Sequence, residues 1–266
     1  MGDTRKLAEL TGPQTLEVLG DDSILVVPIG AIEHHGPHLP LVTDALTAES
    51  VATAAVSAAV AAGLDVWQLP TISVGKSDEH HWASGTLWLR AETLLDTLVD
   101  LGRSVAATPA RKLVFLNGHG GNVAMLGVAL REIRRHFGLM TFAMPAMRVP
   151  DEGPELGAAD EEGIGIHGGW AETSIVLHLR PDLVRTDRLV RNVPAGLGAW
   201  EQLGFNGKPV AFGWLSDDFG PLGIVGDATT ASADAGKRIF EHSTDEAVAA
   251  LGEIDRFELP PRTRLS

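Results

Sequence analysis

A short apolar run, then a loop rich in glycine, histidine and carboxylates, then a helical pattern: this arrangement occurs twice in the chain. The first run covers 23–29 (SILVVPI) and ends at Gly30, and the second covers 112–116 (KLVFL). Both runs are short and largely apolar, and the first is rich in β-branched residues, which predicts buried strands. Strands that alternate with helices in this way predict an α/β fold with a mostly parallel sheet.

The rest of the chain, taken as one domain over residues 1–266, continues this alternation. The other predicted elements are helices at 45–62, 92–107, 122–137, 170–179 and 231–251, and strands at 66–69 and 140–143. Between about 180 and 230 the pattern fades into Gly, Pro, Asp and Trp with short apolar runs. We expect irregular surface there, as a subunit contact or a wall of the site, and not a separate domain.

The composition excludes several classes of function. The 266 residues contain no cysteine, which rules out disulfides, thiolate metal sites and a cysteine nucleophile. The net charge of −14 disfavours nucleic acids and membrane surfaces as partners, since both bind clustered Lys and Arg. The first ten residues lack the apolar stretch of a signal peptide, and 51–64 is too short to span a bilayer. We therefore expect a cytoplasmic protein.

The first loop carries the sequence E-H-H-G-P-H at 33–38, followed by Asp44. It begins where a buried strand should end, and ligand sites of parallel sheets collect at that edge. If the chain stays extended, Glu33 and His35 project to one side and His34 to the other, because side chains alternate along a strand. Asp44 lies at the start of the next helix, where an aspartate is either an N-cap or a bridge between two cations.

The second loop, N-G-H-G-G-N at 117–122, places His119 among glycines that leave room around its imidazole. A helix is predicted to begin at Asn122, with this residue as its cap. The amides of that first turn would offer partial positive charge to a carbonyl oxygen. Strand, ligand-bearing loop and helix thus follow one another here as they do in the first loop.

A third cluster, G-I-G-I-H-G-G-W-A-E-T-S at 163–174, places His167 on a glycine-rich loop and Glu172 in the first turn of a helix. The match to G-x-G-x-x-G does not indicate dinucleotide binding, because an acidic loop precedes it instead of a strand. One of the two residues is a candidate metal ligand and the other a candidate proton carrier. The alternative for Glu172 is an ordinary charge at the start of a helix.

These three clusters offer carboxylates and imidazoles, the ligands that hold zinc, manganese or iron with positions open for water. We therefore predict a hydrolase with a metal centre of two divalent ions (Zn, Mn or Fe). The neighbouring histidines 80 and 81 do not form H-E-x-x-H, so a zincin is not indicated.

The segment G-A-I-E-H-H-G-P-H-L-P at 30–40, with T-D at 43–44, resembles the signature of the creatininase family, the creatinine amidohydrolases and their relatives. N-G-H-G-G-N and H-G-G-W-A-E-T-S resemble that family's second and third motifs, in the same order. The resemblance covers about 20–180 and implies a three-layer αβα sandwich and a homo-oligomer, usually a hexamer. It also implies that Glu33, Asp44 and His119 hold one ion, while His35, Asp44 and a further carboxylate hold the other.

One departure from the family pattern bears on the ligands. Creatininase itself carries a glutamate ligand two residues after the histidine of the second motif, where this chain has Gly121. The resemblance to relatives with glycine there implies that Glu172 is the substitute ligand, and it argues against creatinine as the substrate. A smaller departure is His34, where relatives commonly have glutamine.

The resemblance also implies that His167 is the catalytic histidine, which would donate a proton to the leaving nitrogen, a role suited to the pKa of imidazole. The other candidates would orient a ligand or contact the substrate: His34, His38, His80, Trp82, Gly120, Gly121, Asn122 and Trp170. The alternatives are a polar loop for His80 and packing in a core or interface for the two tryptophans.

The leading hypothesis is hydrolysis of a C–N amide bond in a small or cyclic substrate by hydroxide formed at two cations. Peptide trimming of the mycofactocin-maturation type is the runner-up, and ring opening of a keto-cyclitol uses the same chemistry. A non-catalytic homologue that binds a metal or ligand is the alternative of another class. A serine hydrolase is weaker, since the chain has no G-x-S-x-G motif.

Overall fold

The computed structural model describes residues 5–205 and 207–260, and within them a parallel sheet forms the centre of the fold. Its four strands lie in the order β2-β1-β3-β4. They are β1 (Ile24–Ile29), β2 (Val66–Gln68), β3 (Lys112–Asn117) and β4 (Met140–Pro145). β1 and β3 pair in parallel from Ile24 opposite Lys112 to Ile29 opposite Asn117, so both strands end at the same edge of the sheet.

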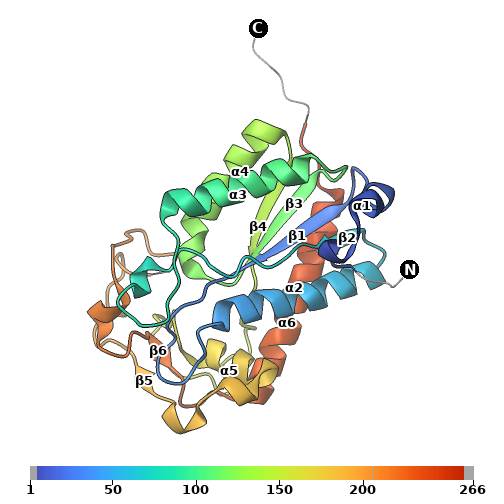
Figure 1. Cartoon of the computed structure of the whole chain (residues 1–266). Coiled ribbons are helices and arrows are strands. Elements are labelled where there is room, and N and C mark those ends of the chain that lie inside the picture. The colour runs from blue at the N-terminus through green and yellow to red at the C-terminus, as the bar shows by residue number, and fades with distance from the viewer. Residues whose placement is uncertain (1–4, 206, 261–266) are drawn as a thin grey trace.

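Helices cover both faces of this sheet (Figure 1). The helices of the described chain are α1 (Gly12–Val18), α2 (Thr43–Ala61), α3 (Ala91–Ala106), α4 (Val123–Phe137), α5 (Trp170–Leu179) and α6 (Ala233–Arg256). Of these, α3 and α4 cover one face and α2 and α6 the other. Because strand side chains alternate, Leu25 and Val27 pack with residues of α3 and α4, whereas Ile24 and Val26 pack with α2 and α6. The three-layer αβα arrangement with a parallel sheet, predicted from the sequence, is confirmed.

The structure differs from the predicted elements mainly at their ends and in the segment 180–230. α6 runs on to Arg256, and α1 was not indicated by the sequence pattern. In the segment 180–230, β5 (Arg191–Asn192) and β6 (Gly226–Asp227) form a small antiparallel pair. Strands of two residues are too short for a period-two pattern to reveal, which explains why the sequence indicated only irregular structure there.

Gly30 lets the end of β1 approach the start of α2. A Cβ atom at this position would lie 2.5 Å from both Cα and N of Ala45, a separation that no real side chain adopts. The neighbours are backbone atoms, so they cannot rotate away. The close approach fixes the distance between the loop that follows β1 and the first turn of α2, which carries Asp44.

Gly30→Ala is expected to lower the free energy of unfolding by about 1–3 kcal/mol, because the added methyl group forces β1 and α2 apart. Urea unfolding followed by tryptophan fluorescence measures the change. Gly20→Ala is the matched control, since a Cβ at position 20 meets no described atom within 4 Å. Equal stability of the two variants would contradict the close packing of Gly30.

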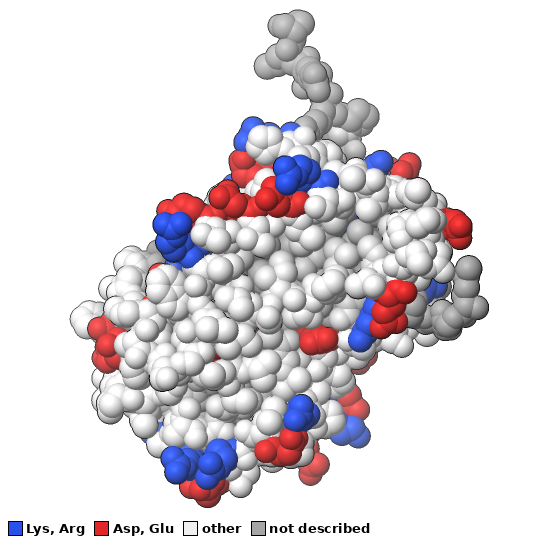
Figure 2. Space-filling model, viewed as in Figure 1, with Lys and Arg blue, Asp and Glu red and all other residues white. Residues whose placement is uncertain are grey.

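The surface gives two further facts about the chain. Figure 2 shows a face whose charged side chains gather near its edges, while its centre carries very few. Among the described residues, no helix combines the length and the apolar character that crossing a bilayer requires.

Candidate metal centre

The predicted site residues meet at the edge of the sheet where β1 and β3 end. The backbone N–H of Gly118 donates to the carbonyl oxygen of Ile29 at 2.8 Å, which holds the two loops side by side beyond the strands. Three chain segments converge there: the loop after β1, the loop after β3, and the loop that leads into α5. Glu33, His35 and His119 are all almost fully buried, with exposed fractions of 1%, 0% and 6%.

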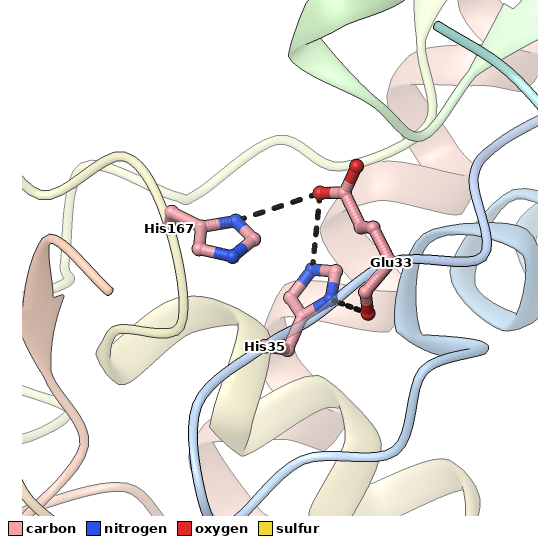
Figure 3. A group of neighbouring side chains, drawn as sticks. All are labelled: Glu33, His35 and His167. Atoms are coloured by element: carbon pink, nitrogen blue, oxygen red, sulfur yellow. Dashed lines mark hydrogen bonds and ion pairs between the residues drawn. The ribbon is translucent and has the colours of Figure 1, made fainter. Parts of the chain in front are cut away.

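Glu33, His35 and His167 form the part of the cluster drawn in Figure 3. The Glu33 carboxylate lies 3.9 Å from His35 Nε2 and 3.7 Å from His167 Nδ1, both measured to Oε1. His35 Nδ1 lies 3.1 Å from the carbonyl oxygen of Glu33, which fixes the orientation of the ring. If His35 Nδ1 carries the proton, this hydrogen bond leaves Nε2 of His35 with a lone pair directed into the cluster.

Asp44 lies between two of the imidazoles. Its Oδ1 is 3.0 Å from His35 Nε2, and its Oδ2 is 3.0 Å from His119 Nδ1. Asp44 stands in the first turn of α2, but its carboxylate is not engaged as a cap: the N-cap position is Val42, and no side chain caps this helix. The two oxygens of one carboxylate thus face ligands from two different loops.

Glu172 comes from the first turn of α5, on the third side of the cluster. Its Oε2 accepts a hydrogen bond from the backbone N–H of Gly168 at 2.6 Å and lies 3.9 Å from His35 Nε2. The positive φ of Gly168 (64°) gives the loop the turn that aims this N–H at the carboxylate. Glu172 is therefore more than a surface charge of a helix, because its carboxylate is directed into the cluster.

Two residues just before α3 complete the cluster, and only one of them was expected. His80, a predicted candidate, is buried, with Nε2 3.6 Å from Glu33 Oε1. The carboxylate of Glu79 lies 3.4 Å from His119 Nε2 and was missed by sequence reasoning. The available signal was its place in the run D-E-H-H-W at 78–82, which the sequence analysis used only for its histidines.

The spacing of these donors fits metal ions. Three trios bring one donor atom each to within 4.8 Å of one another: Glu33–His35–His167, Glu33–Glu79–His119 and His35–Asp44–Glu172. Among the described residues, Glu33 Oε2 and Asp44 Oδ2 are buried without a partner in hydrogen-bond geometry, although imidazole nitrogens of His119 lie beside them. Ligands of one cation lie about 3 Å apart with lone pairs that converge on the ion and not on each other.

Without cations, the cluster holds protons. Burial opposes a charged imidazole, but Asp44, with Glu172 and Glu33, raises the pKa of His35 to about 10. Glu33 and Asp44 likewise raise the pKa of His119 well above its usual value despite its burial. Burial raises the pKa of Glu172 to about 7. In the absence of metal ions, the protonated imidazoles therefore neutralise the charge of the carboxylates.

His167 is the neutral imidazole of the group. Burial, together with the nearby His35 and His80, lowers its pKa well below the usual value. Its Nε2 lies 2.7 Å from the carbonyl oxygen of His34, so this nitrogen carries the proton and donates it. Nδ1 is then unprotonated and faces Glu33 across 3.7 Å. His167 is thus set to accept a proton at Nδ1 before it can donate one.

Some predicted candidates support the loops from outside the cluster. His34 points away from the carboxylates, with Nε2 2.9 Å from the carbonyl oxygen of Leu222. His38 Nε2 lies 3.0 Å from the Thr173 hydroxyl, and burial lowers the pKa of His38 to about 4. Trp82 donates to the Ser216 hydroxyl at 2.7 Å. These contacts position the loops without reaching the central carboxylates.

The remaining four candidates divide between the cavity and the packed interior. Gly120 and Gly121 both line the cavity; a Cβ atom at Gly120 would meet no described atom within 4 Å, whereas one at Gly121 would lie 2.2 Å from the Lys76 carbonyl oxygen. Trp170 is buried in the apolar cluster between α5 and α6. Asn122 occupies the N-cap position of α4, as predicted, but its side chain makes no capping hydrogen bond. The side chain accepts from the backbone N–H of Lys76 at 3.0 Å and donates to the carbonyl oxygen of Gly30 at 3.1 Å.

A cavity of about 780 Å³ opens over the cluster. Glu33, Asp44, His119, His167 and Glu172 lie at its base. Its other wall comes from the segment 204–215, through Phe205, Phe212 and Trp214. The rings of this wall pack on one another, with centroids 5.4 Å apart for both Phe205–Phe212 and Phe205–Trp214. The cavity therefore joins a polar base to an aromatic wall.

Comparison with known proteins assigns this architecture. Residues 8–251 match the family described as creatininase, creatinine amidohydrolase. The chain belongs to the creatininase family. The resemblance seen in three motifs is thus confirmed and extends over nearly the whole chain, including the segment 180–230. Its curated relatives are hydrolases by name, which supports the prediction of an enzyme.

Individual members of the creatininase family show how the similarity is distributed. The chain is 38% identical to the mycofactocin precursor peptide peptidase of Mycolicibacterium smegmatis, over 82% of this chain and 79% of that protein. It is 31% identical to the creatinine amidohydrolase of Pseudomonas putida, over 92% and 93%. A solved structure named creatininase Mn superposes with a TM-score of 0.75 at 28% identity, over 94% and 98% of the two chains. The similarity therefore extends to metal-bearing members.

Metal binding is expected to release protons from this site. The raised pKa of His35, about 10, lies above neutral pH, so this imidazole is protonated in the metal-free protein at pH 7 and must lose a proton to become a ligand. Glu33 and Asp44 raise the pKa of His119 in the same direction. Affinity should therefore rise with pH between 6 and 9, by about tenfold per unit for each proton displaced. Calorimetric titration in two buffers of different ionisation enthalpy measures the release.

Two variants sharpen this test. His35→Gln should release about one proton fewer than the unaltered protein, because its amide carries no titrating proton. His136→Gln is the control, since this histidine is about half exposed on α4 and distant from the cluster in the sequence. Identical heats of binding in both buffers would mean that the imidazoles are already neutral.

Proposed function

We propose that this creatininase-family hydrolase uses two divalent cations to cleave an amide C–N bond in a short peptide. The single observation that carries the proposal is the cavity of about 780 Å³ that joins the carboxylate–imidazole cluster to an aromatic wall. The base supplies ligands for hydrolytic metal ions, and the wall supplies contacts for an apolar side chain of the substrate. The similarity to peptidases of the same family supports this choice.

The charge of the cavity supports two ions instead of one. Five carboxylates line it: Glu33, Asp44, Asp78, Glu79 and Glu172. Lys76, the lysine among its described lining residues, already pairs with Asp78. Two divalent cations would neutralise the four carboxylates that remain. Imidazole and carboxylate ligands suit zinc, manganese or iron, and both manganese and zinc occur in the names of similar creatininase structures.

Glu33, Asp44 and His119 would hold one ion, and His35, Asp44 and Glu172 the other, with Asp44 between them. Bound divalent cations lower the pKa of water toward neutrality and polarise a carbonyl group. The chain's own residues do the rest. His167 would accept the proton of the attacking water at Nδ1, the nitrogen left free by its hydrogen bond to the His34 carbonyl. It would then donate the same proton from Nδ1 to the leaving nitrogen.

The size of the cavity supports a short peptide as the substrate. A single five-membered ring would contact the base of the cavity and leave the aromatic wall untouched. A peptide that places its scissile amide over the cluster can extend an apolar side chain to Phe212 and Trp214. Burial of such a side chain contributes about 1.5–3 kcal/mol to binding. We therefore expect peptides with an apolar or aromatic residue beside the scissile bond to be preferred.

The test is a substrate panel with the metal-loaded protein. We expect turnover of short peptides with Phe, Tyr or Leu next to the scissile amide, and at least about tenfold lower kcat/KM with Ala there. Creatinine, simple formamides and lactams complete the panel. Trp214→Leu should reduce the preference for aromatic residues, and Trp200→Leu, an exposed tryptophan outside the cavity, is the control. Turnover of creatinine with no cleavage of any peptide would reject the peptide proposal.

We also propose that the chain assembles into a homo-oligomer, a hexamer by its family resemblance. The sparsely charged centre of the face in Figure 2 supports association, as do exposed apolar residues such as Leu87 and Trp88. Light scattering on the eluting protein measures the assembly. A monomer at micromolar concentration would reject it.

A further inference from the structure

One carboxylate in the cavity has no role in the proposed ligand set. Glu79 stands in the short 3-10 helix Asp78–His80, and its Oε1 lies 3.4 Å from His119 Nε2. Glu33 Oε2 lies 3.3 Å from the same nitrogen. The three donor atoms from Glu33, Glu79 and His119 all lie within 4.8 Å of one another. The spacing is that of ligands around one ion.

A buried, unpartnered oxygen points to a ligand at this place. Glu33 is 1% exposed, and within the described part of the chain no donor meets its Oε2 in hydrogen-bond geometry. An isolated buried carboxylate oxygen is costly unless a cation or a donor compensates it. Of the described residues, His119 is the ion-pair partner of Glu79, and neither lysine nor arginine reaches it. The two carboxylates therefore flank one imidazole nitrogen, and among the described residues no lysine or arginine pairs with either of them.

The residue opposite Glu79 is shaped to admit it. A Cβ atom at Gly121 would lie 2.7 Å from Glu79 Oε1, 2.4 Å from His119 Nε2 and 2.2 Å from the carbonyl oxygen of Lys76. Any side chain at position 121 would displace both the carboxylate and the imidazole. Glycine at 121 and glutamate at 79 thus occupy complementary space beside His119.

The geometry points to Glu79 as a carboxylate ligand of the ion held by Glu33 and His119. This assignment rests on the proposed two-ion function and adds a ligand from a fourth chain segment. In the competing role, Glu79 binds no metal ion and is an outer acceptor, which only accepts a hydrogen bond that orients the imidazole. The Lys76 carbonyl oxygen, 2.8 Å from His119 Nε2, already makes a contact of this kind. The two roles differ in what they demand of residue 79: a ligand needs an anionic oxygen, whereas an acceptor needs only a carbonyl oxygen.

The test measures metal binding in the absence of substrate. The full-length metal-free protein is titrated with Zn²⁺ and with Mn²⁺ against a competing chelator, and the bound metal is counted by elemental analysis. In Glu79→Gln and in Glu79→Ala we expect one of two ions to bind at least about a hundredfold more weakly, beyond the range usual for residues that only orient a ligand. Asp78→Asn is the matched control, because this neighbouring acid lines the same cavity but belongs to none of the trios.

Each outcome has a distinct meaning. Unchanged affinities for both ions in Glu79→Gln would overturn the assignment. Weak binding in Glu79→Ala with retained affinity in Glu79→Gln would overturn it in favour of the outer acceptor. Thermal melting of the metal-free variants shows whether their folds are intact. Failure of the unaltered protein to bind two ions would instead reject the proposed function on which the assignment rests.

Discussion

Replacement of Asp44 by asparagine is expected to remove most of the bound metal and nearly all of the activity. The two oxygens of Asp44 each lie 3.0 Å from an imidazole, one from His35 and one from His119. An amide keeps the shape of the side chain but supplies one neutral oxygen and an N–H₂ group that repels a cation. If the change costs about 4 kcal/mol of transition-state stabilisation, kcat/KM falls by roughly a thousandfold.

Elemental analysis and kcat/KM on the same preparation measure both effects of Asp44→Asn. Asp182→Asn serves as the control, because the Asp182 carboxylate is exposed and paired with Arg180 on the surface. Asp44→Asn that retains two ions and full turnover would contradict the bridging position. Loss of metal with retained turnover would show that hydrolysis does not depend on the ions.

His167→Ala should separate metal binding from proton transfer. His167 lies beside Glu33, but its hydrogen bond to the His34 carbonyl leaves Nδ1 as a proton acceptor in the cavity. Removal of a positioned general base or acid lowers turnover by about 10²–10⁴-fold. Because the other imidazoles and carboxylates remain in place, the variant is expected to bind two ions with little change in affinity.

The rate as a function of pH provides the second measurement for His167. Burial lowers the pKa of its imidazole, so Nδ1 is already free to accept a proton at neutral pH. Lowering the pH protonates the imidazole and should reduce turnover, and this acid limb should be absent in His167→Ala. His81→Ala, which alters an exposed histidine after the 3-10 helix, is the control. An unchanged rate in His167→Ala, or loss of both ions, would contradict a role in proton transfer.

The sequence was informative where local pattern and site coincide. Strands that end at Gly30 and before Gly118 were visible as apolar runs, and the alternation of side chains after β1 placed Glu33 and His35 on one side. Because the carboxyl ends of parallel strands share one edge of the sheet, His35 and His119, 84 positions apart in the sequence, could be expected to meet. The alternation of strands and helices likewise predicted a mostly parallel sheet, and the family resemblance implied the αβα layers.

The sequence was not informative where position depends on distant contacts. Asn122 has the look of a helix cap, yet its amide joins Lys76 to Gly30, two loops that only the folded chain brings together. The run D-E-H-H-W places Glu79 beside two histidines, but only the folded chain shows that its carboxylate faces the space left by Gly121. The aromatic wall at 204–215 comes from irregular backbone, which has no period to recognise.

The polar base and the aromatic wall of the cavity come from different kinds of chain segment, which affects how such an enzyme can change its substrate. The proposed ligands after β1 and β3 stand on loops at the edge of the sheet, where the amide of Asn122 joins Lys76 to Gly30. The aromatic wall belongs to a later stretch of chain without regular structure, where insertions and substitutions are accepted readily. One inherited reaction can therefore be redirected to new molecules by changes in a single surface segment, while the chemistry beneath it is passed on intact.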